Sequence, residues 1–127
     1  MPGTELPVTF TFMAVCAALL MPLTGWIGVY WGSRGILRGD GGDPILFKRI
    51  RAHGNFIETA PLIAMALLAA EWLGLAQLWL WAAVGSFFIG RLLHWVMYDN
   101  KMRGGPMILV TAPGLLLGGW VLYTLWT

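Results

Sequence analysis

The chain has 127 residues, of which 58% are hydrophobic and only 11% are charged, and its mean hydropathy is +0.73. Because soluble domains carry about 25% charged residues, these values exclude an ordinary soluble core and indicate one membrane domain over residues 1–127. The net charge of +2 is too small to favour a nucleic-acid partner. A single cysteine, Cys16, excludes an intrachain disulfide and argues against a cysteine metal site.

The first predicted helix covers residues 6–33, which contain no charged side chain. A helix needs about 20 residues to cross about 30 Å of hydrocarbon, so this segment is long enough to span a membrane with some tilt. A secretory signal would begin with a basic region and carry a shorter apolar run. Here Glu5 precedes the run, and Arg34 and Arg38 follow it, so we expect an uncleaved helix.

The next stretch, residues 34–47, is a glycine-rich loop that contains Asp40 and Asp43. Two aspartates beside glycines suggest a cation loop, but the length and the later glutamate of a calcium-binding loop are missing, which favours a solvated turn. The second helix is predicted over about 45–73, with Asp43 as its N-cap and Pro61 inside it.

A short turn marked by Glu71, Gly74 and Gln77 separates this helix from a third one at about 77–98. A last loop near residues 99–105 then leads to the fourth helix, at about 106–126. The predicted fold is therefore an all-α integral membrane protein, a bundle of four transmembrane helices.

The basic residues predict the orientation of this bundle. The first loop and the helix entry that follows it hold Arg34, Arg38, Lys48, Arg49 and Arg51, and the third loop holds Lys101 and Arg103. The second loop and both termini hold none. By the positive-inside rule, the first and third loops face the cytoplasm and the termini lie on the opposite side.

Two stripes of polar side chains approach the membrane from the cytoplasmic side. The second helix carries Arg51, Asn55 and Glu58 at i, i+4 and i+7, and the third carries Arg91, His94 and Tyr98 at i, i+3 and i+7, so each set shares one helix face. Glu58 and Arg91 both lie about 11 Å of helix from the cytoplasmic ends. At that depth they either pair with each other or line a cleft that holds a polar ligand.

The combined set has excess positive charge and one carboxylate, which suits a small zwitterionic peptide: arginines bind its carboxylates and Glu58 binds its ammonium group. Taken singly, each residue has a simpler explanation. His94 could satisfy a carbonyl within the bundle, Tyr98 could be an interfacial tyrosine, and Arg34 and Arg103 could be positive-inside anchors. The convergence of two stripes favours a site, from which His53 is left out because it lies off the stripe. No metal site is expected, because the chain has two histidines, one cysteine and no HExxH motif.

The segment RAHGNFIETAP, followed about forty residues later by GR-x-x-H-x-x-x-Y, resembles the MAPEG family, the membrane-associated proteins of eicosanoid and glutathione metabolism. This resemblance covers nearly the whole chain. It implies a homotrimer of four-helix protomers and glutathione as the cofactor, bound between neighbouring protomers near the cytoplasmic face. Its similarity to bacterial members implies a bacterial inner membrane.

Position by position, the resemblance implies that the residues contacting glutathione are Arg34, Arg51, Asn55, Glu58, Arg91, His94 and Tyr98. It also implies that Arg103, three residues before Pro106, is the catalytic residue that stabilises the glutathione thiolate. The implied activity is that of a glutathione transferase or peroxidase acting on hydrophobic electrophiles or lipid hydroperoxides, typical of detoxification.

Some positions depart from particular branches of the family. The prostaglandin synthase branch has an Arg-Ser pair just after the loop-three proline and a tyrosine one turn later, whereas this chain has Ile108 and Leu109 and no Tyr or Arg over 104–120. The tyrosine pair of the leukotriene synthases is His94 and Tyr98 here. A non-catalytic protein that binds lipid or a partner therefore stays open as the alternative. A small drug/proton exporter is disfavoured, because residues 6–33 lack the carboxylate that such exporters use.

Overall fold

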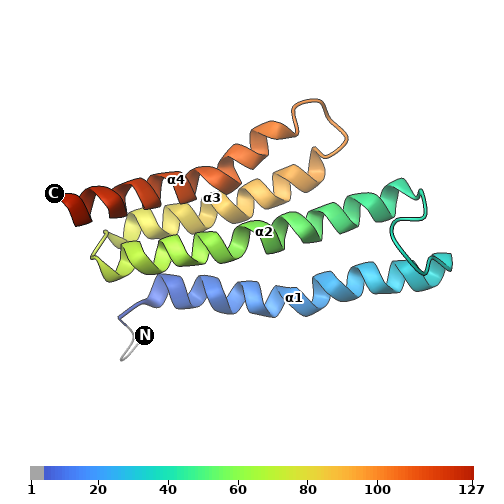
Figure 1. Ribbon diagram of the computed structural model, residues 1–127, viewed down its shortest axis with the longest axis horizontal. Helices are drawn as coiled ribbons and strands as arrows, with labels where there is room; N and C mark the ends of the chain where they lie inside the picture. The colour runs from blue at the N-terminus through green and yellow to red at the C-terminus, as the bar shows by residue number, and fades with distance from the viewer. Residues whose placement is uncertain (1–4) are drawn as a thin grey trace.

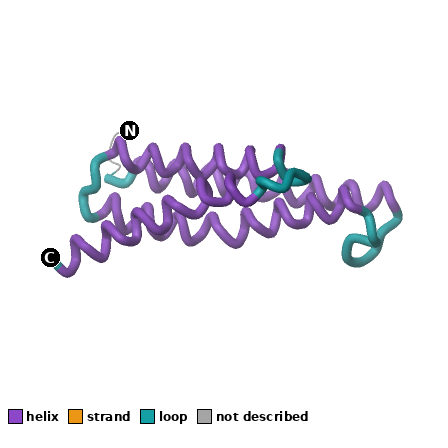
Figure 2. Tube along the Cα trace, turned by 90° about the horizontal axis from the view of Figure 1, so that it is seen from above, coloured by secondary structure: helices purple, strands orange, loops and turns teal. Residues whose placement is uncertain are grey.

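The computed structural model describes residues 5–127 as four helices and no strand. Their bounds are Pro7–Arg34 (α1), Pro44–Trp72 (α2), Gln77–Val96 (α3) and Gly104–Trp126 (α4). Successive helices run antiparallel and side by side, as Figures 1 and 2 show. The predicted all-α fold of four helices is confirmed.

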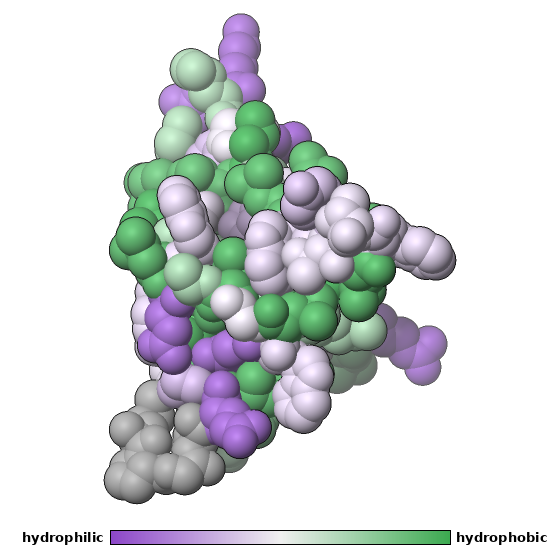
Figure 3. Space-filling model, turned by 90° about the vertical axis from the view of Figure 1, so that its left-hand side faces the viewer, coloured by the Kyte–Doolittle hydropathy of each residue, from purple (hydrophilic) through white to green (hydrophobic). Residues whose placement is uncertain are grey.

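The bundle has two chemically different ends. The α1–α2 loop and the α3–α4 loop lie at one end, which we call the basic end, and the α2–α3 turn lies at the other with the C-terminus and the start of α1, the terminal end (Figure 1). Apolar and weakly polar side chains cover most of the terminal end, with few strongly hydrophilic ones (Figure 3). The structure thus gathers the loops that carry the arginines at one end of the molecule.

Local chemistry sets the helix boundaries. The Asp43 carboxylate accepts hydrogen bonds from the backbone N–H groups of Ile45 and Leu46, at 2.9 and 3.2 Å, and so begins α2. Gly35, with φ of +66°, ends α1 in the left-handed conformation that glycine adopts without strain. α3 ends at Val96 rather than near residue 98, which leaves Tyr98 in the turn that follows the helix.

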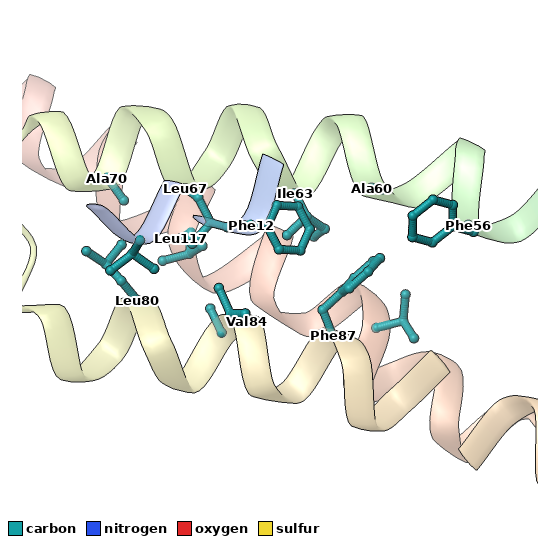
Figure 4. Close-up of a cluster of buried hydrophobic side chains, with 13 residues drawn as sticks. Phe12, Phe56, Ala60, Ile63, Leu67, Ala70, Leu80, Val84, Phe87 and Leu117 are labelled. Carbon is teal, nitrogen blue, oxygen red and sulfur yellow. The ribbon is translucent and has the colours of Figure 1, made fainter. Parts of the chain in front are cut away.

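The core runs along the facing sides of α2 and α3. Phe12 of α1 and Phe87 of α3 are fully buried, with ring centroids 5.2 Å apart in an edge-to-face arrangement. Figure 4 shows the side chains of α2 and α3 pointing toward each other across this layer, with Phe56 toward one end and Leu80 toward the other. The part of the bundle that faces its own interior is therefore almost entirely apolar.

α3 and α4 approach so closely that one position requires a glycine. The same contact supplies a hydrogen bond that Pro113 cannot make. A Cβ on Gly90 would lie 2.9 Å from the Pro106 carbonyl oxygen, so the two backbones approach directly. Pro113 has no N–H to offer the Leu109 carbonyl one turn earlier, and the Ser86 hydroxyl donates to that carbonyl at 2.6 Å. Ser86 of α3 thus provides the hydrogen bond that the Leu109 carbonyl of α4 would otherwise lack.

Glu71 has a structural role that the sequence did not suggest. It was expected to mark the turn after the second helix, but it lies in the last turn of α2 and its side chain is buried. Its carboxylate accepts hydrogen bonds from the backbone N–H groups of Val8 and Thr9, at 3.0 and 2.7 Å. These are two of the unpaired donors at the start of α1, so Glu71 caps that helix from another element.

The outer surface is that of a membrane protein. α1 and α4 are long and apolar enough to cross a bilayer, and few of their residues are buried within the protomer. A soluble protein would bury such helices, whereas here side chains such as Met21 and Leu115 are largely exposed. The polar start of α2 and the Gly, Ser and Arg residues of α3 lower the hydropathy of those helices, and their crossing of the membrane stays a prediction.

Candidate functional site

The polar stripe of α2 forms a connected cluster. The Arg51 guanidinium donates to the Asn55 side-chain oxygen at 2.9 Å and lies 3.7 Å from the Glu58 carboxylate. A Cβ at Gly54 would lie 3.4 Å from Arg51 Nη1, so the glycine leaves the guanidinium room to lie along the helix. The i, i+4, i+7 spacing therefore does bring all three side chains together.

This cluster faces outward from the protomer. The side chains of Arg51 and Glu58 are 41% and 61% exposed, although both belong to a helix whose later turns are apolar. Each retains hydrogen-bonding groups that the protomer does not use. The cluster is thus available to a ligand or to another copy of the chain.

Arg91 turns to a different face of α2. Its guanidinium donates to the Ala52 carbonyl at 3.0 Å and lies 3.8 Å from the Met107 sulfur. Of the two arrangements considered for Glu58 and Arg91, direct pairing is not found, because Glu58 pairs with Arg51 instead. The Glu58 charge still acts on Arg91 through space, so the two stripes are neighbours rather than partners.

The rest of the α3 stripe leads to the third loop. His94 is buried, and its ring stands edge-on to the Tyr98 ring with centroids 5.8 Å apart. The positive charges of Arg91 and Arg103 both act on His94. The Arg103 guanidinium lies over the Tyr98 ring at 5.3 Å and donates to the Tyr98 carbonyl at 3.3 Å. Within the protomer, Arg91, His94, Tyr98 and Arg103 therefore form one positively charged group.

Arg34 stands apart from both stripes. Its guanidinium lies over the Tyr30 ring at 5.3 Å, on its own helix, and its charge acts on Asp43 in the first loop. No contact links it to Arg51 or to Arg103 within the described residues.

The sequence analysis overlooked two cations that bind aromatic rings across the bundle. The Arg49 guanidinium lies over the rings of Trp26 and Tyr30, at 4.7 and 4.6 Å, and the Lys48 ammonium lies over Trp95 at 4.2 Å. Two aromatic residues four positions apart near a loop, opposite a Lys-Arg pair, were the available signal. His53, which the sequence left out of the site, lies 3.2 Å from the Thr24 hydroxyl and away from the cluster.

Within residues 5–127 no group of three or more His, Cys, Asp or Glu side chains is arranged to hold a metal ion. The candidate site residues named above carry guanidinium groups, one amide, one carboxylate, an imidazole and a phenol. Such a set can bind carboxylates and an ammonium group and can stabilise an anion beside Arg103.

Comparison with known proteins identifies the family of the chain. The model of the MAPEG family matches residues 9–125, nearly the whole length. The chain belongs to the MAPEG family. No curated protein and no solved structure matches it. Family membership makes the chain a membrane protein and associates it with glutathione or eicosanoid metabolism.

Proposed function

We propose that this MAPEG protein is a glutathione-dependent transferase or peroxidase that activates the glutathione thiol for attack on hydrophobic electrophiles or lipid hydroperoxides. The observation that carries the proposal is the outward-facing Arg51–Asn55–Glu58 cluster at the basic end, on a chain of this family. Glutathione has two carboxylates, an ammonium group and a thiol. The donors and acceptors of the basic end match each of these groups.

The proposed binding roles follow from charge. Arg51 and Arg91 attract the two carboxylates, Asn55 donates an amide hydrogen bond, and Glu58 accepts from the ammonium group. His94 and Tyr98 lie between Arg91 and Arg103 and complete the polar wall. Arg34 joins them from a neighbouring protomer.

We propose that the protein forms a homotrimer in which this arrangement is completed. A charged residue that faces lipid within a membrane helix costs several kcal/mol, and Glu58 is 61% exposed in the protomer. A second copy packed on this face of α2 removes the cost and creates a seam in which glutathione is held by two subunits. With the basic end at the cytoplasmic side of a bacterial inner membrane, the seam opens toward the cytosol, where glutathione is found.

Arg103 is the proposed catalytic residue. A guanidinium beside the sulfur lowers the thiol pKa from about 8.5, so more thiolate is present at neutral pH. With a chlorinated nitrobenzene, the thiolate forms the C–S bond and chloride leaves. With a hydroperoxide, it attacks the terminal oxygen and gives an alcohol and a glutathione sulfenic acid. A second glutathione then yields the disulfide and water.

One observation favours the second candidate, a non-catalytic protein that binds lipid or a partner. Arg103 already lies on Tyr98 and donates to its carbonyl, so its guanidinium is engaged within its own protomer. In the catalytic reading this contact positions Arg103, and the free N–H groups face the sulfur. In the second reading the contact serves only to fold the loop.

The experiment measures thiolate absorbance and conjugation of chlorodinitrobenzene by the purified protein with glutathione. Arg103→Ala should lower turnover about 8–25-fold at pH 7, the change in thiolate fraction when a pKa lowered by one to two units returns to about 8.5, while glutathione affinity falls much less. Lys101→Ala, which removes the same charge two residues away in the same loop, should leave the rate unchanged. If the unmodified protein shows no thiolate absorbance with glutathione, no conjugation and no peroxide reduction, the protein is a non-catalytic binder.

A further inference from the structure

A second candidate site involves a different face of α2 from the Arg51–Asn55–Glu58 cluster, the face that carries Ala52 and Phe56. It is an open groove of about 300 Å³ between α1, α2 and α3. Its walls are hydrocarbon and aromatic side chains: Leu19, Leu23, Phe56, Phe88 and Leu92. Its volume is at the lower end of the range that bound small molecules and acyl groups occupy.

Two tryptophans form the rim of this groove. Trp26 of α1 and Trp95 of α3 both line it, and their ring centroids are 4.8 Å apart in an edge-to-face arrangement. Trp95 belongs to the last turn of α3, and Trp26, eight residues before the end of α1, lies beside it. Both rings are therefore toward the basic end, where tryptophans lie close to lipid headgroups. The groove therefore extends from headgroup level toward the hydrocarbon.

A cation stacks on each of these tryptophans. Arg49 lies 4.7 Å from the Trp26 ring centroid, and Lys48 lies 4.2 Å from that of Trp95. The order Arg49, Trp26, Trp95, Lys48 thus places one positive charge on either side of the rim. Lys48 also lies 3.7 Å from Asp99, an exposed carboxylate, so part of its charge is balanced.

Arg49 is the less satisfied of the two cations. No carboxylate of the described residues forms a salt bridge with it. One of its terminal nitrogens donates to the Trp26 carbonyl at 3.0 Å, but its Nε is buried and has no hydrogen-bond partner within residues 5–127. A buried donor of this kind calls for an acceptor, and the half-buried Arg49 cation, which has no carboxylate partner among the described residues, is suited to an anion.

We propose that this groove is a binding site for an anionic phospholipid, with one acyl chain between α1, α2 and α3 and the phosphate against Arg49 and Lys48. Positive charge at the rim and hydrocarbon below it match the two parts of one amphiphile. A soluble anion would leave the groove unfilled, and an uncharged lipid would leave Arg49 unpaired. Arg91, bonded to the Ala52 carbonyl, closes one wall of the groove. Apart from Arg91, the groove shares no residue with the proposed glutathione site.

The experiment offers the purified protein, in detergent, an equimolar mixture of phosphatidylglycerol and phosphatidylcholine with identical acyl chains, and counts the retained lipids by native mass spectrometry. We expect phosphatidylglycerol to be retained in preference by on the order of tenfold. The double variant Lys48→Gln/Arg49→Gln should lose this preference. The matched variant Arg38→Gln/Lys101→Gln, which removes two charges from the same end, should keep it.

A second measurement is the rise in melting temperature of each variant when each lipid is added. Because every variant is compared with its own lipid-free form, a variant of lower stability can still be tested. The rise with phosphatidylglycerol should exceed that with phosphatidylcholine, persist in Arg49→Lys at a reduced size and disappear in the double variant. Inorganic phosphate should not displace the lipid. Equal retention of the two lipids, or equal losses in the two double variants, would overturn the proposal and assign the aromatic stacks to bundle stability alone.

Discussion

The two carboxylates of α2 differ in exposure and in the groups that they contact. Glu71, near the terminal end, is 8% exposed and accepts hydrogen bonds from two backbone N–H groups of α1. Glu58, near the basic end, has a side chain that is 61% exposed, and its carboxylate lies 3.7 Å from Arg51 of its own helix. The first is fully used by the fold, and the second is not.

This difference separates structure from function along the bundle. A carboxylate whose acceptors are occupied can be removed only at a cost in folding free energy. An exposed ion pair contributes about 0–1 kcal/mol to stability, so its presence in an otherwise apolar membrane helix needs another explanation. The carboxylate at the terminal end therefore stabilises the fold, and the one at the basic end is free to serve the ligand site that we propose. Variants at the two ends should affect different measurements.

Replacing Glu71 should have the largest effect on stability. Glu71→Ala removes a charged acceptor and leaves the N–H groups of Val8 and Thr9 unpaired, so it should lower the unfolding free energy by about 3 kcal/mol. Thermal unfolding in detergent measures the loss. Glu5→Ala, an exposed acidic residue at the same end, is the control and should change little. Equal stability of the two variants would show that the cap contributes nothing.

The same contrast between crowded and open positions applies to the glycines of α3. Gly90→Ala places a methyl group 2.8 Å from the side chains of Leu109 and Val110, and should cost about 2 kcal/mol because α4 has to move. Gly85→Ala meets nothing within 4 Å and gains helix propensity, so it should be neutral or stabilising. Unfolding of both variants under one detergent condition tests the pair. A stable Gly90→Ala protein would mean that α3 and α4 are not in direct contact.

The sequence predicted contacts within one helix correctly and missed contacts between helices. The Arg51–Asn55–Glu58 cluster was predictable because helical spacing alone puts the three side chains on one face. The Glu71 cap was not, since its partners lie 62 and 63 positions away at the start of α1. Helical spacing also could not show that Arg91 turns to the Ala52 carbonyl, because the rotation of α3 against α2 is set by packing of the whole core. Local patterns identified the side chains, and tertiary contacts chose their partners.

Replacing Glu58 should affect binding rather than folding. Glu58→Gln removes the negative charge proposed to bind the ammonium group of glutathione, and should weaken binding about tenfold, or about 1.4 kcal/mol. Its effect on stability should stay below 1 kcal/mol, because the Arg51–Glu58 pair is exposed. Calorimetric titration with glutathione, alongside thermal unfolding, separates the two effects. Asp99→Asn, an exposed carboxylate at the same end, is the control.

If Glu58→Gln instead bound glutathione normally and unfolded easily, the comparison between the two ends would fail. Glu58 would then be a second structural carboxylate, and the ligand would have to be held elsewhere at the basic end.

The smallest effect is expected at Asp43, where α2 begins at the basic end. Partial desolvation pushes the pKa of this carboxyl up, but hydrogen bonds from the Leu46 N–H, the Tyr30 hydroxyl and the Ile45 N–H, with the charge of Arg34, hold the pKa below its usual 3.8. A lowered pKa means that the cap stabilises the folded protein above about pH 3.8, and that its contribution is lost as the pH falls through the lower folded value. Titration of the Asp43 carboxyl carbon by NMR should give a midpoint under 3.8. Tyr30→Phe should raise that midpoint by removing one donor, and Tyr123→Phe at the terminal end should not move it. A midpoint unchanged by Tyr30→Phe would mean that the hydroxyl does not hold the carboxylate, and that the Trp31 indole, which donates to the Gly39 carbonyl at 2.7 Å, is left to bond the first loop to α1.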